Sequence, residues 1–349
     1  MYNHYLSEKN YIMAESLFYA LRSGKPNKFL DFTRTFLSML IPDVYHRSRR
    51  EKILKRARLR DDYDYMLDRV NYYCKIDEPW SISPENRTET GPTYLKFRGA
   101  IGDYRRRMFR TAYFFDQRDV TRYFPRHLRW NYCPGDVYFT PDEPTIVKSR
   151  LLSKDNKNSV LLKLDKLRHF MFVSDRKTFA QKRDCAIFRG KIRYSRQRTT
   201  FLERCFSHPM FDCGVVGSNE GYPEEWMSAK KSIAQHLDYK FIMAIEGNDV
   251  ASNLKWVMSS NSLAVMPRPT CETWFMEGRL IPDFHYVEVR DDFSDAAEKL
   301  QYYIDHPDRA EAIIANAHRY VEQFFDKERE QMIQLMVFER YLESSGQMW

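Results

Sequence analysis

The second half of the chain contains short apolar runs at regular intervals, and these runs constrain the fold more than any other feature. They are rich in residues that favour strands: CAIF (185–188), CGVV (213–216), FIMAI (241–245), LAVM (263–266) and HYVEV (285–289). Segments of helical character alternate with them: RTTFLERCF (198–206), VASNLKWVMSS (250–260), SDAAEKLQYYIDH (294–306) and PDRAEAIIANAHRYVEQFF (307–325). This alternation predicts an α/β fold with a parallel, doubly wound sheet. Ser294 is predicted to cap the third of these helices, with Asp295 in its first turn.

Length and charge limit the class of protein. With 349 residues, the chain suits two domains better than one. A hydrophobic fraction of 43% and a charged fraction of 30% are typical of a globular chain. The formal net charge of +8 favours an anionic partner, which can be a nucleic acid, a nucleotide or an anionic membrane surface.

The cysteines and histidines predict neither disulfides nor a metal site. None of the six cysteines belongs to a CxxC pair, so a reduced chain in the cytoplasm is expected. The nine histidines do not cluster at metal-ligand spacings, so no metal is expected. The N-terminus lacks the pattern of a secretory signal, and no apolar stretch approaches the roughly 18 residues of a membrane span. Contact with a membrane is therefore expected only at its surface.

The first half of the chain begins with a basic helical segment. Residues 1–60 have helical character and end in the run HRSRREKILKRARLR (46–60), and 61–75 continue it. The run can be a solvated helix face, a contact with anionic headgroups, or a docking surface for another biosynthetic enzyme. Asp62-Tyr63-Asp64 matches the DxD pattern of metal-dependent sugar transferases, but we interpret these carboxylates as surface ion pairs because no strand precedes them.

Two further segments, TAYFFD (111–116) and GDVYFT (135–140), are predicted to be strands. The second leads into PDEPTIVKSR, which places Asp142 just after its end. Catalytic groups gather at the carboxyl ends of strands in open α/β sheets. Since no Ser-His-Asp set is apparent, Asp142 is the best-placed candidate for a general base.

Two loops at strand ends have the composition of an anion site. In CAIFRGKIRYSRQR (185–198), Arg189 and Gly190 end a strand, and Arg193 and Arg198 follow in a loop whose guanidinium groups suit a diphosphate. The alternative is a solvated basic loop. In EGNDVASNLKW (246–256), a buried strand leads through a glycine turn into a helix start, where free backbone N–H groups attract anions.

The second loop supplies most of the candidate ligands, although a plain turn is the alternative. Ser252 can donate a hydroxyl hydrogen bond, and Lys255 lies on the same helix face. Both loops follow strands of one predicted sheet, which favours a nucleotide site. A later segment adds Glu272, an acid beside Trp274 and Phe275, which can bond and stack on a sugar or belong to the core. The candidates from these two segments are Glu246, Gly247, Asn248, Asp249, Ser252, Asn253, Lys255 and Glu272.

Taken together and in this order, these segments resemble glycosyltransferase family 90, most closely its bacterial lipopolysaccharide branch. The resemblance covers roughly residues 35–325. Its motifs are GDVYFTPDEPTIVKSR, NSVLLKLDKLRHF, AIFRG, EGNDVASNLKWVMSSNS, ETWFMEGRLIPDFHYVEV and DDFSD. The Ser-x-Arg of the family's eukaryotic members corresponds here to the Ser252–Lys255 segment, where the basic residue is Lys255 and is shifted by one position.

The resemblance implies a GT-B-like fold, in which two Rossmann-like domains face a cleft and the C-terminal one holds the nucleotide sugar. It also implies an inverting, metal-independent transfer from a UDP-sugar. The family's catalytic aspartate corresponds to Asp142 of Asp142-Glu143-Pro144, and its arginine ligands of the diphosphate to Arg193 and Arg198. The expected units are a basic helical segment, an acceptor-side domain, a nucleotide-sugar domain and a C-terminal helix packing back: 1–75, 76–178, 179–325 and 326–349.

The first functional hypothesis is therefore a glycosyltransferase that moves glucose or galactose from a UDP-sugar to a lipopolysaccharide core or a similar glycan acceptor. It is expected in the cytoplasm, at the inner membrane, with no cofactor and no nucleic acid as partner. The alternative is a basic nucleic-acid-binding protein without enzymatic activity, which the charge and the abundant aromatic residues support. No helix-turn-helix, zinc-finger or RNP signature accompanies them.

Overall fold

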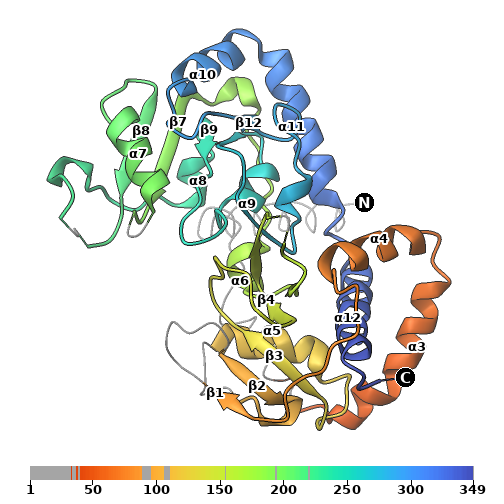
Figure 1. Cartoon of the computed structure of the whole chain (residues 1–349). Coiled ribbons are helices and arrows are strands. Elements are labelled where there is room, and N and C mark those ends of the chain that lie inside the picture. Colours follow the sequence, from red (N-terminus) through yellow and green to blue (C-terminus); the bar gives the residue numbers. More distant parts are fainter. Residues whose placement is uncertain are drawn as a thin grey trace.

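The computed structural model describes residues 33, 37, 40–88, 96–105, 111–153, 155–192, 195–218 and 221–348. Figure 1 shows two five-stranded sheets in separate halves of the molecule, with helices packed around each. About half of the predicted N-terminal helical segment, 1–75, lies outside the described residues. Its end is helical as expected, since α3 spans Asp43–Arg58 and α4 spans Tyr63–Tyr73.

The first sheet is mixed. Its strands lie in the order β1 (Arg87–Thr88), β2 (Phe97–Ala100), β3 (Arg129–Cys133), β4 (Thr145–Val147) and β6 (Ser159–Leu161). The pairs β1–β2 and β2–β3 are antiparallel, and the pairs β3–β4 and β4–β6 are parallel. The helices α5 (Thr111–Thr121) and α6 (Lys166–His169) belong to this half.

Both strands predicted in this half are wrong. TAYFFD begins α5, where Tyr113, Gln117, Val120 and Thr121 are buried at helical spacing. The polar pair Gln117 and Thr121, in which the hydroxyl of Thr121 donates to Gln117 at 2.7 Å, disguised that helical period. GDVYFT is an irregular link between β3 and β4. Prolines on both sides of it cannot donate to a strand ladder, which limits regular pairing there.

The second sheet confirms the predicted parallel α/β unit. Its order is β12 (Val287–Glu288), β10 (Leu263–Met266), β9 (Tyr239–Met243), β7 (Arg183–Gly190) and β8 (Phe211–Val215), and every pair is parallel. These strands are the five apolar runs of the sequence. The helices of this half are α7 (Arg196–Cys205), α8 (Ile233–His236), α9 (Leu254–Met258), α10 (Ala296–Asp305) and α11 (Pro307–Glu322).

Two helix starts differ from the prediction. The helix expected over 250–260 is only the five-residue α9, because the chain before it bends so that Val250 and Ala251 enter the core. The N-cap of α10 is Asp295 rather than Ser294. The side chain of Asp295 does not cap the helix, because it accepts a hydrogen bond of 2.9 Å from the backbone N–H of Arg290.

Segments from distant parts of the sequence join the two halves. The strands β5 (Ser149–Leu151) and β11 (Cys271–Thr273) form a two-stranded antiparallel sheet. The last helix, α12 (Lys327–Ser344), crosses back and packs against α3, α4 and α5 beside the first sheet (Figure 1). The described part also contains short 3₁₀ turns: η1 (Ile101–Asp103), η2 (Phe179–Gln181), η3 (Glu224–Trp226) and η4 (Glu277–Arg279).

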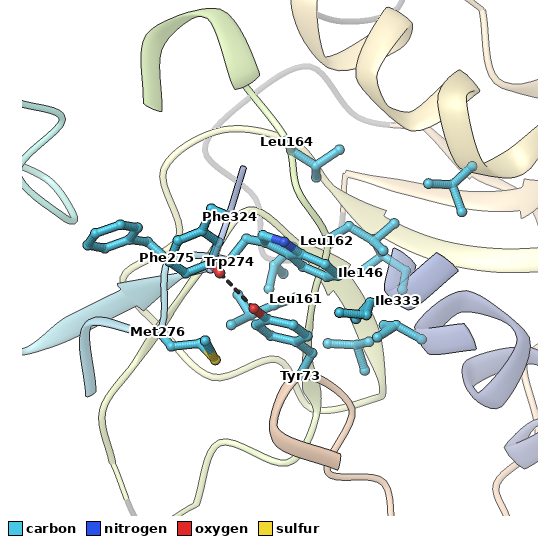
Figure 2. Close-up of a cluster of buried hydrophobic side chains, with 14 of the residues drawn as sticks. Tyr73, Ile146, Leu161, Leu162, Leu164, Trp274, Phe275, Met276, Phe324 and Ile333 are labelled. Atoms are coloured by element: carbon cyan, nitrogen blue, oxygen red, sulfur yellow. Dashed lines mark hydrogen bonds between the residues drawn. The ribbon is translucent and has the colours of Figure 1, made fainter. Parts of the chain in front are cut away.

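Apolar and aromatic side chains fill the space between these joining segments, as Figure 2 shows. Tyr73 of α4 stacks on Trp274, with ring centroids 3.9 Å apart, and its hydroxyl donates to the carbonyl of Trp274 at 2.8 Å. Phe275 packs with Phe324 in the same cluster. Trp274 and Phe275 are fully buried, so they are core residues. The sequence had left two possibilities open for them, the core and stacking on a sugar.

Within the described residues, no helix has both the length and the apolar character needed to cross a membrane. The same residues contain no group of three or more His, Cys, Asp or Glu side chains placed to hold a metal ion. The cysteines are all unpaired thiols, as the sequence predicted.

Candidate functional site

Polar side chains from both sheets meet around Lys148, which lies between β4 and β5. Its ammonium is 2.7 Å from a carboxylate oxygen of Asp136, which follows β3, and 2.7 Å from one of Asp249, which follows β9. Ser149 donates a hydrogen bond of 2.7 Å to Asp249, and Asn248 donates one of 3.4 Å to Asp136. The carboxyl ends of strands from the two sheets therefore supply one polar cluster.

The local sequence explains how Asp136 reaches this position. After β3 ends at Cys133, Gly135 adopts a φ of +114°, a conformation that side chains other than glycine's strongly disfavour. This turn directs the chain away from the sheet edge and places Asp136 opposite the loop after β9. The side chain of Asp136 keeps 19% of its surface exposed, whereas Lys148 and Asp249 keep 1% and 2%.

The charges around Asp136 keep its carboxylate ionised. Burial alone would raise its pKa, but the ammonium of Lys148 and the guanidinium of Arg168 in α6 hold the pKa below its ordinary value. Arg168 lies 3.9 Å from Asp136 and is half-exposed. For Lys148 the two effects have the opposite sign. Burial alone would lower its pKa, but the neighbouring Asp249 raises the pKa above its ordinary value, so the lysine is charged.

Arg198 lies beside this cluster, on α7. Its guanidinium donates hydrogen bonds of 3.2 and 2.8 Å to the carbonyl of Ile245 and one of 2.7 Å to that of Lys191. None of the carboxylates in the described ranges forms an ion pair with it. Burial, with the nearby charge of Arg168, lowers the pKa of Arg198 to about 10. A half-buried guanidinium that donates to carbonyl groups suits an anionic ligand, so this position favours one.

The two predicted anion-binding loops lie side by side. Ser195, the N-cap of α7, donates a hydrogen bond of 2.9 Å to the carbonyl of Glu246. A Cβ atom on Gly247 would lie 3.1 Å from the guanidinium of Arg198, so the glycine permits this close approach. The carboxylate of Glu246 accepts bonds of 3.1 Å from the backbone N–H groups of Thr270 and Cys271, and burial raises its pKa.

The other residues of the first loop do not join the cluster. Arg189 turns away from it: its guanidinium pairs with Asp212 and donates to the backbone at 2.7 and 2.8 Å. Gly190 ends β7, and a Cβ there would lie 2.8 Å from the ring of Phe188. Arg193 lies outside the described residues.

The later candidates of the second loop lie in the interior. Lys255 is fully buried, and its ammonium forms an ion pair with Glu277. Asn253 donates to the carbonyl of Met243 at 3.0 Å, and Ser252 is half-buried just before α9. Glu272 is also fully buried, where it accepts from Arg150 at 2.7 Å and from the hydroxyl of Tyr72. In this structure the side chains of Asn253, Lys255 and Glu272 bind the protein's own groups.

Asp142 lies just before the amino end of β4. The strand that was expected to end before Asp142 is absent, so Asp142 does not follow the carboxyl end of a strand. Its side chain is exposed, and its carbonyl accepts a hydrogen bond of 2.8 Å from Asn158. The neighbouring Glu143 pairs with Arg98 at 2.6 Å. The carboxylate at the carboxyl end of a strand in this region is Asp136, six residues earlier.

Sequence reasoning missed Asp136, Lys148, Arg168 and Ser195. A usable signal for Asp136 was Pro-Gly-Asp directly after the strand RWNYC, but Arg129 and Asn131 hid that strand. For the DxD segment the structure agrees with the interpretation as ion pairs, since Asp62 binds Arg60 at 2.6 Å and Arg329 at 2.9 Å.

Comparison with known proteins adds two findings. Residues 161–343 match the family described as glycosyl transferase family 90. The chain is also 40% identical over 277 residues to "O-glucosyltransferase LpsA" of Dichelobacter nodosus, an alignment that covers 78% of this chain and 81% of that protein.

Proposed function

This chain belongs to glycosyltransferase family 90, and we propose that it transfers glucose from UDP-glucose to a hydroxyl of a lipopolysaccharide core or a similar glycan acceptor. The choice of glucose rests on the name of the relative, an O-glucosyltransferase, and UDP-galactose is the second candidate donor. Membership of an enzyme family favours an enzyme over a nucleic-acid-binding protein without activity.

The single observation that carries the proposal is the meeting of Asp136 with the loop after β9. A glycosyl transfer needs a base beside the acceptor hydroxyl and a cationic site for the leaving diphosphate. Asp136 comes from the first sheet, and Asn248, which donates to it, belongs to the loop that adjoins Arg198. We propose that the two sheets are the cores of two Rossmann-like domains in a GT-B-like arrangement, with the sugar donor between them.

Two carboxylates are candidates for the general base. The family resemblance favours Asp142, whereas the geometry favours Asp136, which lies at the carboxyl end of a parallel strand and contacts the second loop. A lowered pKa keeps Asp136 ionised at neutral pH, as a proton acceptor requires. We therefore propose Asp136 as the base and keep Asp142 as the second candidate.

The proposed reaction is a single displacement. The base removes the proton of the acceptor hydroxyl while its oxygen attacks the anomeric carbon from the face opposite UDP, so the configuration at that carbon inverts. Negative charge develops on the departing diphosphate. Arg198, the backbone N–H groups near Gly247 and, from the resemblance, Arg193 are proposed to stabilise it without a metal ion.

A panel of UDP-sugars tests this function. The purified chain is incubated with UDP-glucose, UDP-galactose, UDP-xylose and the N-acetyl forms, with and without a chelator, and released UDP is measured. We expect turnover of UDP-glucose above the others, and no loss with the chelator. Absence of turnover with every donor, in the presence of an oligosaccharide acceptor mixture, would contradict the proposal.

We also propose peripheral contact with the anionic inner-membrane surface through α3. Several basic residues of the run pair with acids instead: Arg56 with Glu328 at 2.5 Å and Arg60 with Asp326 at 2.8 Å. Arg49 and Lys52 remain exposed on the same helix, near the exposed apolar side chain of Val44. This combination of cations and apolar groups suits a headgroup layer.

A further inference from the structure

Lys148 is an unusual interior residue, because one buried ammonium faces two carboxylates from opposite halves of the molecule. Its distances to Asp136 and Asp249 are equal, at 2.7 Å. A buried ion pair contributes little net stability compared with apolar side chains of similar volume. Stability alone therefore does not account for a charged lysine at this position, and its two partners suggest another role.

Both partners belong to the proposed machinery. Asp136 is the proposed base, and Asp249 lies in the loop that also contains Gly247 and Asn248. Ser149, the next residue after Lys148, donates to the same oxygen of Asp249 at 2.7 Å. Lys148 and Ser149, the first residue of β5, therefore both hold the loop that follows β9, and Lys148 holds the base as well.

We propose that Lys148 is a positioning residue that fixes the base Asp136 against the diphosphate-binding loop, so that acceptor activation and donor binding occur in one geometry. This inference rests on the proposed function. Reacting groups must be held within a fraction of an ångström, and a misplacement of about 1 Å can lower the rate by about 10²-fold. Lys148 would exert its effect through Asp136 and Asp249, without touching the sugar.

The groups around this triad determine how it titrates. Asp136 faces Lys148, Arg168 of α6 and the amide of Asn248. Lys148 also faces Tyr113 of α5, and the buried His169 of α6 lies near enough for the lysine to disfavour its protonation. Burial lowers the pKa of His169 well below its ordinary value, and Lys148 lowers it further. The imidazole is therefore neutral, and Asp136 and Asp249 are the groups that lose a neighbouring cation when Lys148 is replaced.

Two substitutions should move the acid limb of the pH profile in opposite directions. In Lys148→Met, Asp136 loses its nearest cation, its pKa rises, and the fall of kcat/KM at low pH shifts to higher pH. In Asp249→Asn, the lysine keeps its charge but has only Asp136 to neutralise it, so the acid limb shifts to lower pH. We also expect kcat of Lys148→Met to fall by about 10²-fold, with a smaller change in KM for UDP-glucose.

Lys182→Met is the matched control. Lys182 forms a buried ion pair of 2.7 Å with Asp175, away from this cluster, so its loss tests the effect of removing any interior lysine. The experiment measures UDP-glucose hydrolysis by the full chain between about pH 2 and pH 9, a range that begins below the ordinary aspartate value because the pKa of Asp136 is lowered. We expect Lys182→Met to lower thermal stability and to leave the acid limb in place.

The outcomes separate the inference from the function on which it rests. Acid limbs that shift in the same direction, or do not shift, in an active enzyme would overturn the role of Lys148. If Lys148→Met does not fold, Asp249→Asn alone tests the inference. An acid limb of kcat/KM that stays in place or shifts to higher pH in Asp249→Asn then contradicts the role of Lys148. A wild-type enzyme that turns over no UDP-sugar contradicts the proposed function itself.

Discussion

The environment of Arg198 is the strongest indication of an anionic ligand. Its side chain is half-buried, its guanidinium donates to carbonyl groups, and partial loss of water contact lowers its pKa to about 10. A diphosphate would supply an anionic hydrogen-bond partner at a guanidinium that donates to carbonyl groups. Arg189, by contrast, already has Asp212 as a partner. The two arginines, nine residues apart and both predicted to bind UDP, therefore make a matched pair for mutation.

We predict that Arg198→Ala weakens UDP binding by about 10- to 100-fold, since a hydrogen bond to a charged group contributes about 1.5–3 kcal/mol. Arg189→Ala should lower stability but change UDP affinity by less than about threefold, because its partners are protein groups. Calorimetric titration with UDP measures both. Equal losses of affinity in the two variants would show that Arg198 is not a specific ligand.

At the scale of elements, the strand pair β5–β11 joins the two halves through an interior ion pair. Arg150 of β5 and Glu272 of β11 are both fully buried, and their side chains are 2.7 Å apart. Arg150 also donates to the carbonyl groups of Tyr72 and Ser159 at 2.7 and 3.1 Å. Removal of one charge would leave the other buried without its counter-ion.

We therefore predict that Glu272→Gln lowers the free energy of unfolding by about 3–5 kcal/mol, which urea denaturation can measure. Asp77→Asn is the control, because its ion pair with Lys157 is exposed, and its loss should leave the free energy of unfolding nearly unchanged. If Glu272→Gln is as stable as the wild type but no longer binds UDP-glucose, Glu272 is a sugar ligand rather than a structural residue.

The same elements show what the sequence could and could not predict. The strands of the second sheet are buried on both faces, so their sequences are continuous apolar runs between helices, and periodicity located them. In the first sheet, β3 contains Arg129 and Asn131, and β5 contains Ser149 and Arg150, so no apolar run marked either strand. The interior partners of these polar residues come from elsewhere in the chain, and sequence patterns do not contain that information.

For the site, the sequence located the loops but not the contacts. Arg198, Gly247 and Asn248 were expected near a ligand, and the structure brings them together beside Asp136. Lys255 was expected to face the phosphates, yet it pairs with Glu277 in the core, because α9 is short and buried on all sides. The burial of a charged side chain depends on tertiary packing, which local spacing does not reveal.

At the scale of the whole molecule, we propose separate roles for the basic helix α3, which contacts the membrane, and for the site, which transfers the sugar. Exposed Arg49 and Lys52 lie on α3, and each basic residue near an anionic surface contributes about 1 kcal/mol. We predict that Arg49→Gln with Lys52→Gln lowers the fraction of protein that floats with anionic liposomes, while UDP-glucose hydrolysis in solution is unchanged.

The control for that experiment removes the same charge elsewhere. Arg268 and Arg309 are exposed on the second half, and their replacement by glutamine should leave flotation unchanged. Equal flotation of both double variants and the wild type would instead favour α3 as a docking surface for another enzyme, or as a solvated face.

The central claim is that a base from the first half acts on a donor held by the second half. Such a division predicts that catalysis and donor binding can be separated by mutation. We expect Asp136→Asn to lower UDP-glucose turnover by about 10²- to 10⁴-fold, because general base catalysis contributes about that much, while UDP affinity stays within about threefold of the wild type. Asp142→Asn, measured alongside it, should keep most of its activity.

The turnover of Asp136→Asn therefore tests most directly whether Asp136 is the general base. Strongly reduced turnover with UDP binding retained is the predicted result. Full activity of Asp136→Asn, with activity lost in Asp142→Asn, would contradict the assignment of the base to the carboxyl end of β3.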